Sequence, residues 1–405
     1  MMKSQMEREH LHMSSVWNDY IHSLSLMRKE ESSAGSFRCS CRTGKAPAQQ
    51  KQKQKHLYLV LDDWEKGYGI YRVGEDELVS DAEQLDHPRQ AESPLVRIKA
   101  HHCAWYLAGH GTKIFVMNPA DSSPGIPVFD TATSSMTVCP NTYTRGDLGQ
   151  RALYASVGDR LLSFVYPFID MVGPEPSSLS EETWSVTSME HWLPFNSRSV
   201  RGYAVHPDGR TVFMSVEGYN PDLGSTFSYH LYRNRCCTYA LDTERLDWTY
   251  LGEWILPFAG QGHYDSELDA WVGICLYRER EQAGGRVCCC DVPSAVEPRD
   301  TVPVSKICVD ALFQPGEPHF GTKLLYMGDS KFCLVESRRR VQPMPMDDHD
   351  DGFHLQHRSV KMTSFVLKYD KVGDLQTTRR RAYASMWYQS HKGGHPAEDP
   401  VAFWM

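Results

Sequence analysis

Three histidines and a cysteine lie close together in one short stretch and could in principle bind a metal ion. His101, His102 and Cys103 are consecutive, and His110 follows in the next predicted turn. Imidazole and thiolate groups are the ligands that zinc and copper prefer. Alternate residues of a strand point to opposite faces, however, so His102 would face away from His101 and Cys103. We therefore predict polar roles in turns and strand ends, with no metal and no cofactor.

Two runs of adjacent cysteines, Cys236–Cys237 and Cys288–Cys290, raise the question of thiol chemistry. Neighbouring residues of a strand point oppositely, so each run places at most two thiols on one face, and no Cys-x-x-Cys loop is present. A nucleophilic cysteine needs a lowered pKa and an adjacent base, and the sequence identifies neither. The twelve cysteines show no regular spacing. We predict buried free thiols that pack between structural units, in preference to disulfides.

Carboxylates are concentrated in a loop around His349, from Met346 to Gly352. Oxygen ligands at this density could hold a hard cation, but the loop lacks the ligand spacing and final Glu of an EF-hand. We predict a solvated insertion. The nearby basic runs Arg338–Arg340 and Arg379–Arg381 could pair with this loop or with an acidic partner, although such runs usually mark a solvated face.

Three further carboxylates, Asp62, Asp63 and Asp265, are candidates for the pair that glycoside hydrolases use. That chemistry requires a separation of about 5 to 9.5 Å, which depends on the fold. All three residues stand where a strand gives way to a turn. Because a short carboxylate accepts hydrogen bonds from turn amides, we favour turn capping as their role.

A repeated turn-and-strand pattern must position these residues. Five times a turn bearing Gly or Asp opens an apolar strand, at intervals of roughly 47 to 60 residues, which is typical of a radial β-repeat. The five segments are Gly111 to Met117, Gly158 to Val165, Gly209 to Val216, Asp269 to Leu276 and Asp329 to Glu336.

Single units can be read in more detail. In one, His206–Arg210 contains an Asp-Gly pair between two apolar runs, a strong hairpin signal. Third strands end in Asp in several units, at Asp130, Asp242, Asp291 and Asp370, and Asx turns explain this choice. A further strand from Leu57 brings the count to six. The sequence thus predicts an all-β fold, a single β-propeller of six blades with four antiparallel strands each.

The predicted propeller occupies residues 57–390, with insertions at Glu297 to Pro318 and at Arg338 to Arg358. Residues 1–56 are polar and end in a Gln/Lys run, which predicts a disordered basic tail. Residues 391–405 are predicted to be a loose C-terminal tail, although Phe403–Trp404 could dock.

Charge and hydropathy exclude several classes of protein. The net charge is −8, and residues 1–56 carry ten Lys and Arg against five Asp and Glu, so the remainder is more acidic still. An acidic body argues against nucleic-acid binding. No apolar stretch is long enough for a membrane span or a signal core. We expect an intracellular monomer, cytoplasmic or nuclear, without a membrane partner.

Two segments carry a resemblance to a known family. Leu57 to Trp64 with Gly67–Tyr68, and again Tyr264 to Gly273, resemble a plant family expanded in grasses and known as domain of unknown function 1668. The likeness covers most of residues 57–390. This family is in turn distantly similar to the kelch-type propellers that accompany F-boxes. The resemblance implies a propeller and no known activity. Kelch repeats carry a Gly-Gly pair in each blade, which this chain lacks, and no F-box precedes residue 57.

The function predicted from these observations is non-enzymatic binding of another protein. The chain contains no Gly-x-Ser-x-Gly elbow, no Gly-x-x-x-x-Gly-Lys-Ser/Thr loop and no Gly-x-Gly-x-x-Gly turn. Binding residues favour loops on a rigid scaffold, so His110, Asp265, Arg339 and His349 mark the predicted partner-binding loops. A carbohydrate-active or metal-dependent propeller enzyme remains an alternative. So does a degenerate F-box-type receptor that lacks the F-box.

Overall fold

The chain divides into two compact units, Met1–Lys53 and Gln54–Met405. The computed structural model describes residues of the second unit only: 55–63, 67–74, 89–90, 93–98, 106–117, 125–140, 152–165, 168–173, 184–189, 193–217, 236–276, 284–294, 302–313, 319–339, 355–391 and 400–405. The predicted disordered tail therefore lies outside the described residues, apart from Lys55 and His56.

The described residues form an all-β structure built from four-stranded antiparallel units, which we number I to VI. In sheet order, unit I holds β25 (Val401–Trp404), β1 (Leu57–Asp63), β2 (Gly67–Val73) and β4 (Val96–Ile98); unit II holds β5 (Tyr106–His110), β6 (Lys113–Met117), β7 (Gly125–Asp130) and β8 (Ser135–Pro140); unit III holds β9 (Leu153–Val157), β10 (Arg160–Val165), β11 (Phe168–Val172) and β12 (Val186–Met189).

Units IV to VI follow the same plan. Unit IV holds β13 (Val200–Val205), β14 (Thr211–Glu217), β15 (Cys236–Asp242) and β16 (Asp247–Gly252); unit V holds β17 (Phe258–Asp265), β18 (Ala270–Cys275), β19 (Val287–Cys290) and β20 (Ser305–Ile307); unit VI holds β21 (His319–Gly328), β22 (Lys331–Arg339), β23 (Leu355–Tyr369) and β24 (Leu375–His391).

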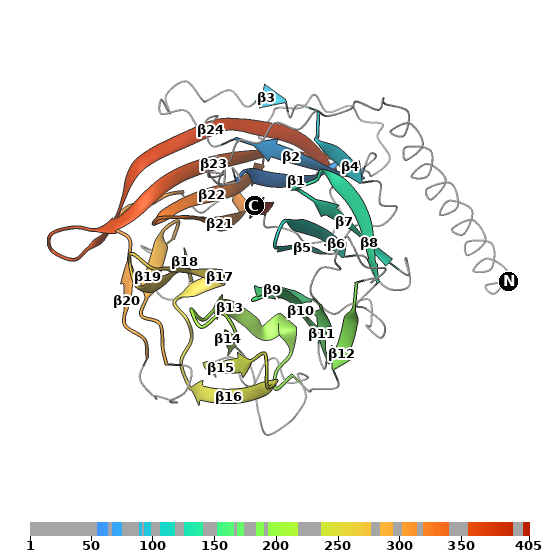
Figure 1. Ribbon diagram of the computed structural model, residues 1–405. Helices are drawn as coiled ribbons and strands as arrows, with labels where there is room; N and C mark the ends of the chain where they lie inside the picture. The colour runs from blue at the N-terminus through green and yellow to red at the C-terminus, as the bar shows by residue number, and fades with distance from the viewer. Residues whose placement is uncertain are drawn as a thin grey trace, which may run out of the picture. The chain divides into compact units, whose positions relative to one another are not determined.

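Two parallel contacts join or extend these units. The first strands of units IV and V, β13 and β17, pair in parallel, so the two units share one eight-stranded sheet. The short strand β3 (Arg89–Gln90) pairs in parallel with β24. The helical structure in the described residues is a single 3₁₀ turn, Ser197–Ser199. Within Gln54–Met405 the units follow one another about a centre, and their first strands lie nearest to it, a β-propeller-like fold (Figure 1).

The turn between the first and second strands explains the repeat seen in the sequence. In units II to VI this turn contains a residue in the left-handed region. A hairpin turn with positive φ suits the twist of the flanking strands, and Gly tolerates it best, with Asp next. The φ values are 58° at Gly111, 56° at Gly158, 73° at Gly209, 48° at Asp269 and 50° at Asp329.

Unit I lacks this turn because its first and second strands come from opposite ends of the described chain. β25 pairs antiparallel with β1. Beyond the strands, the backbone amide of His56 donates to the carbonyl of Met405 over 2.7 Å, and Met405 donates back to His56 over 3.1 Å. The prediction of a loose tail from residue 391 is therefore wrong for residues 401–405, because these residues complete a sheet. The short run Val401–Trp404 alternates too briefly to be recognised as a strand from sequence.

The second strands are buried on both faces, which is why they read as continuous apolar runs. In β1, Leu57, Leu59 and Leu61 pack against unit VI, whereas Tyr58 and Val60 pack against unit II. The same alternation recurs in the other second strands. Strands covered on both sides carry apolar residues at every position rather than at alternate ones.

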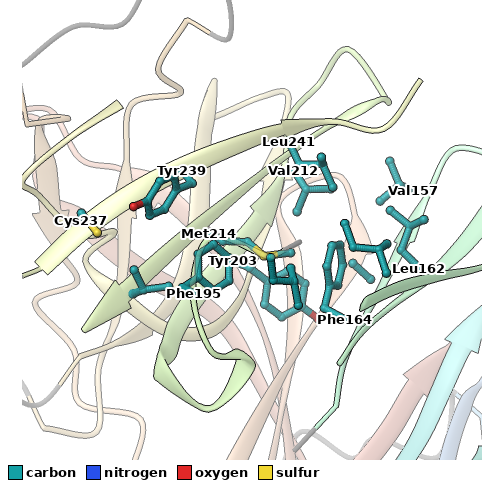
Figure 2. Packing of buried hydrophobic residues seen from close by; sticks show 14 residues of the cluster. Val157, Leu162, Phe164, Phe195, Tyr203, Val212, Met214, Cys237, Tyr239 and Leu241 are labelled. Carbon is teal, nitrogen blue, oxygen red and sulfur yellow. The ribbon is translucent and has the colours of Figure 1, made fainter. Parts of the chain in front are cut away.

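Six apolar clusters occupy the six boundaries between successive units. One cluster joins each pair I/II, II/III, III/IV, IV/V and V/VI, and the sixth joins VI to I. Figure 2 shows the cluster between units III and IV, where Leu162 and Phe164 of β10 meet Val212 and Met214 of β14. The core is thus divided among the boundaries, and each unit is stabilised by two neighbours.

Three of the four aspartates predicted to cap turns at the ends of third strands, Asp130, Asp242 and Asp370, accept from turn amides as predicted. Asp130 Oδ1 accepts from the amide of Ala132 over 2.8 Å. Asp242 Oδ1 accepts from Glu244 and Arg245. At the β23–β24 turn, Asp370 Oδ1 accepts from the amides of Val372 and Asp374.

The predicted insertions need one correction. Glu297 to Pro318 contains strand β20, the outermost strand of unit V, so it is not an insertion between units. Its three residues carry no apolar alternation, and the strand is therefore hard to find in the sequence. Arg338 to Arg358 spans the end of β22 and the start of β23, and residues 340–354 lie outside the described part. No helix among the described residues is long and apolar enough to cross a membrane.

Candidate interaction surface

The predicted site residues that the structure describes lie at the turn between first and second strands. His110 is the last residue of β5, in unit II, and Asp265 is the last residue of β17, in unit V. Units III and IV lie between these two units in the series, so the fold does not bring His110 and Asp265 together. The side chain of Arg339 and the whole of His349 lie outside the described part of the structure, as do the side chains of Asp62 and Asp63.

His110 contacts a hydroxyl group of the neighbouring unit III. Its Nδ1 lies 2.8 Å from Oγ of Ser156 in β9, and Ser156 is exposed. Burial lowers the pKa of His110. This effect is larger than that of Asp159, whose backbone hydrogen bond and negative charge both raise the pKa of His110. The imidazole is therefore neutral near pH 7 and can accept the proton of the Ser156 hydroxyl. His101, His102 and Cys103 are not described, and no group of three metal-binding side chains occurs among the residues that are.

Asp265 is a structural residue, as the turn-capping interpretation predicts. Its side chain is 0% exposed. Oδ1 accepts from the amides of Glu267 and Leu268, at 3.1 and 2.9 Å. The same carboxylate accepts from Ser330 of unit VI, whose amide donates over 2.9 Å and whose hydroxyl donates over 2.8 Å. The Asp265 carboxylate thus fastens two adjacent turns and is not itself accessible to a partner.

Eight of the nine described cysteines are buried in the clusters between units, which confirms the packing prediction for them, whereas Cys236 is half-buried and belongs to none of these clusters. Cys288 and Cys290 belong to the cluster between units IV and V, whereas Cys289 points to the cluster between V and VI. The described cysteines are free. Burial raises the pKa of the Cys333 thiol to about 12, so this thiol is not a nucleophile at neutral pH.

Other buried carboxylates are also used by the fold. Asp130 lies 3.0 Å from the ammonium group of Lys113. Arg201 Nε donates to Glu217 over 2.6 Å, and Arg338 Nε donates to Glu336 over the same distance. In the described residues these acidic groups have structural partners and do not converge on one cavity.

The surface feature that lacks a structural explanation is an exposed aliphatic segment at the outer edge of unit V. We call residues 302–311 the edge segment; it contains β20. Four of its side chains are apolar and exposed: Val302 at 63%, Val304 at 65%, Ile307 at 37% and Val309 at 52%. Contiguous exposed apolar residues of this kind are uncommon on monomeric proteins and often mark interaction sites.

The edge segment runs beside the turn that joins β23 and β24 of unit VI. We call residues 368–381 the basic hairpin. Lys306 Nζ donates to the carbonyl of Gly373 over 2.9 Å and lies 4.7 Å from the ring centre of Tyr369. The amide of Val309 donates to the carbonyl of Leu375. These contacts place the exposed aliphatic residues next to the basic hairpin.

Further contacts also join the edge segment to the basic hairpin. The Asp310 carboxylate accepts from the amide and hydroxyl of Thr377, and Arg380 donates to the carbonyl of Ala311 over 3.0 Å. At the tip of the hairpin, Val372 is 87% exposed. The two segments therefore form one continuous surface.

This surface is basic although the chain as a whole is acidic. The two segments contain six Lys and Arg residues against three Asp residues, whereas the whole chain carries −8. Of the three acids, Asp310 accepts hydrogen bonds from Thr377, and Asp370 accepts from its own turn. Sequence reasoning noted Arg379–Arg381 as a possible contact for an acidic partner but missed the edge segment. The signal in the sequence was the aliphatic run Val302, Val304, Ile307 and Val309.

Comparison with known proteins places the chain in a family without an assigned activity. The family described as "Protein of unknown function (DUF1668)" matches residues 54–385. Comparison with curated proteins gives no match.

Among solved structures, the chain is similar to the periplasmic gluconolactonase PpgL of Pseudomonas aeruginosa, with 10% identity, a TM-score of 0.38 and coverage of 82% of this chain and 99% of that one. It is also similar to TolB from Acinetobacter baumannii, with 12% identity, a TM-score of 0.30 and coverage of 72% and 65%. Likeness at this level carries no argument about activity.

Proposed function

The chain belongs to the DUF1668 family of proteins of unknown function, and from that premise we propose that it is a non-enzymatic β-propeller that binds another protein. The observation that carries the proposal is the edge segment with its basic hairpin, an exposed surface that is both aliphatic and cationic. The buried carboxylates of Asp130, Glu217, Asp265 and Glu336 have structural partners, which leaves this surface as the stronger candidate for a function.

We further propose that units I to VI are the six blades of one closed propeller. The pairing of β25 with β1 supports closure, because it joins the last described strand to the first. The cluster between units VI and I supports it as well, since it completes a cycle of boundaries. A closed propeller is a rigid carrier for surface segments and needs no chemistry of its own.

The experiment that tests the function is affinity capture from native tissue, with mass spectrometry, using the full chain and a shortened chain that starts at Lys55. A partner that is retained by both chains and confirmed with purified proteins is the expected result. A partner retained only by the full chain would assign binding to the tail instead. Recovery of the adaptor that F-box proteins bind would favour the receptor alternative.

A second candidate function is hydrolysis, which the contact between His110 and Ser156 favours. A neutral imidazole within 2.8 Å of an exposed hydroxyl is the arrangement of a base and a nucleophile. A fluorophosphonate probe tests it. Labelling of Ser156 that is lost in His110→Gln would support a serine hydrolase, and the absence of labelling would leave the contact as a fastening between units II and III.

A further inference from the structure

We propose that the edge segment binds its partner by strand addition, and that the added strand is an extended peptide of alternating aliphatic and acidic residues. The inference deepens the proposed interaction function: it assigns the surface and the chemistry of the partner. It starts from the backbone of β20 rather than from its side chains.

The hydrogen-bond register leaves two residues of β20 with their peptide groups directed away from the sheet. The carbonyl of Val304 accepts from Asp291, and the amide of Cys308 donates to Val287. Alternate residues of an antiparallel strand turn their N–H and C=O groups to opposite sides. Ser305 and Ile307 therefore direct these groups to the outer edge.

The structure also limits the length of this edge. On one side Pro303 has no N–H to offer. On the other side the outward amide of Val309 already donates to Leu375. Between them, Ser305 and Ile307 offer two N–H and two C=O groups, and β20 is the last strand of its sheet. An added segment of about five residues fits this interval, given about 3.3 Å per residue in a strand.

An unpaired edge is normally protected by charge, bulges or a covering loop, because it is a template for another strand. β20 is short and carries Lys306, but the Lys306 ammonium group is held by the Gly373 carbonyl and the Tyr369 ring. Its charge is thus drawn toward unit VI. The exposed Val304 and Ile307 remain on either side of it.

Other outer strands provide a comparison. In β8 of unit II the exposed residues are mostly polar, with Ser135 and Thr137 beside Val138. In β16 of unit IV, Asp247 is exposed beside Tyr250. Only β20, among the outer strands whose side chains are described here, is followed and preceded by exposed aliphatic residues.

Charge selects the kind of partner. The edge segment and basic hairpin together carry three more cationic than acidic residues, and Arg379, Arg380 and Arg381 are exposed. An added strand beside β20 meets this hairpin at its end near Val309. Aliphatic side chains on one face of the peptide can contact Val304, while acidic side chains complement the hairpin.

The test is selection of a random decapeptide library on the immobilised full chain, followed by anisotropy measurements with the recovered peptides. We expect enrichment of peptides that combine Val, Ile or Leu with Asp or Glu. Their affinity should fall at least tenfold for Ile307→Pro, which removes an outward N–H, and change less than twofold for Ile307→Thr, which keeps it. Val138→Thr, on β8, is the matched surface control.

Proline is tolerated in an edge strand where its missing N–H faces outward, so Ile307→Pro should fold, and an unchanged melting temperature verifies this. If that variant unfolds, recovered peptides with N-methyl groups at alternate residues make the same test on the unaltered chain, with the same tenfold loss expected.

The inference fails if the recovered peptides are basic or bind Ile307→Pro as well as the unaltered chain. In that second case the interaction function stands and only the surface is wrong. If no peptide is enriched and capture from tissue also gives no partner, both the inference and the proposed function fail.

Discussion

Unit V contains two regions that use polar and apolar groups in opposite ways. At its inner turn, the charged residue Asp265 is fully buried and accepts four hydrogen bonds, two of them from Ser330 of unit VI. At its outer edge, Val304 and Ile307 are exposed. The inner turn places a carboxylate where apolar residues usually lie, and the outer edge places aliphatic residues where polar ones usually lie.

The two departures from the ordinary pattern have different meanings. The buried carboxylate is explained by its contacts, because the amides of Glu267 and Leu268 and both donors of Ser330 belong to the turns that it joins. Among the described residues, no contact of this kind explains the exposed aliphatic side chains. A buried polar group with hydrogen-bond partners is thus explained by the fold, whereas a run of exposed apolar groups is a candidate binding surface.

The largest expected effect is at the inner turn. Asp265→Ala should lower the free energy of unfolding by about 3 to 5 kcal/mol, because it leaves the amides of Ser330, Glu267 and Leu268 without their acceptor. The Ser330 hydroxyl keeps a second acceptor, Oε2 of Glu267. Ser330→Ala, which removes one donor and keeps the carboxylate, should cost about 1 kcal/mol. Urea denaturation, monitored by tryptophan fluorescence, measures the free energy of unfolding of both variants. Equal losses for the two variants would show that the carboxylate is no more important than one hydrogen bond.

The sequence predicted the inner turn far better than the outer edge, for a physical reason. Positive φ at Gly111 or Gly209 restricts the residue types that a turn accepts, so the turns recur visibly along the chain. Asp265 could be assigned a capping role because Asx turns are local. Its bond to Ser330 joins residues 65 positions apart, and no local pattern reports it.

The outer edge could not be predicted because the exposure of its side chains depends on how the other elements of the fold pack around it. Val304 and Ile307 have the residue types of a buried strand, and only the fold shows that they are exposed. The same holds for Val401–Trp404, whose place in unit I depends on pairing with β1, more than three hundred residues away. Which outer strand stays uncovered is a property of the assembled units.

The second expected effect is a dependence of stability on pH that comes from a buried histidine of unit V. His263, also in β17, donates from Nε2 to the carbonyl of Leu324 in β21 over 3.0 Å. Burial lowers its pKa from 6.5 to about 4, although the bond to Leu324 opposes the shift. The folded state therefore favours the neutral ring. Its contribution to stability is fully present above pH 6.5 and is lost as the pH falls toward 4, by up to about 3 kcal/mol.

Comparison of the unaltered chain with His263→Gln isolates this contribution, since a glutamine amide can donate to Leu324 but does not titrate between pH 4 and 7. The free energy of unfolding, measured at pH 7 and pH 4.5, should fall more steeply in the unaltered chain. Parallel pH profiles for the two proteins would refute the assignment.

The third expected effect could break the rule that a buried carboxylate stabilises the fold. Asp170 in β11 is buried opposite Ser163 of β10, and its Oδ1 has no hydrogen-bond partner among the described residues. Burial raises its pKa, against a smaller effect of the Ser188 hydroxyl. A raised pKa means that ionisation opposes folding, so stability declines as the pH rises from the unfolded value near 4 through the folded one.

Asp170→Asn removes this charge and should leave stability at pH 7 unchanged or raise it by about 1 kcal/mol. Thermal unfolding at pH 5 and pH 7.5 gives the readout, and Ser163→Ala, at the facing position, serves as the control for loss of a hydroxyl. A loss as large as that of Asp265→Ala would mean that Asp170 has a partner that stabilises its charge.

The smallest expected effect is at the outer edge, where one substitution can be made at two sites of unit V. Val272→Thr in β18 places a hydroxyl in the fully buried cluster between units V and VI and should cost about 1 to 3 kcal/mol. Val304→Thr changes a side chain that is 65% exposed and should alter stability by less than about 0.5 kcal/mol. If urea denaturation instead shows similar losses at both sites, Val304 contributes to the core of the fold, and its exposure would no longer argue for a partner.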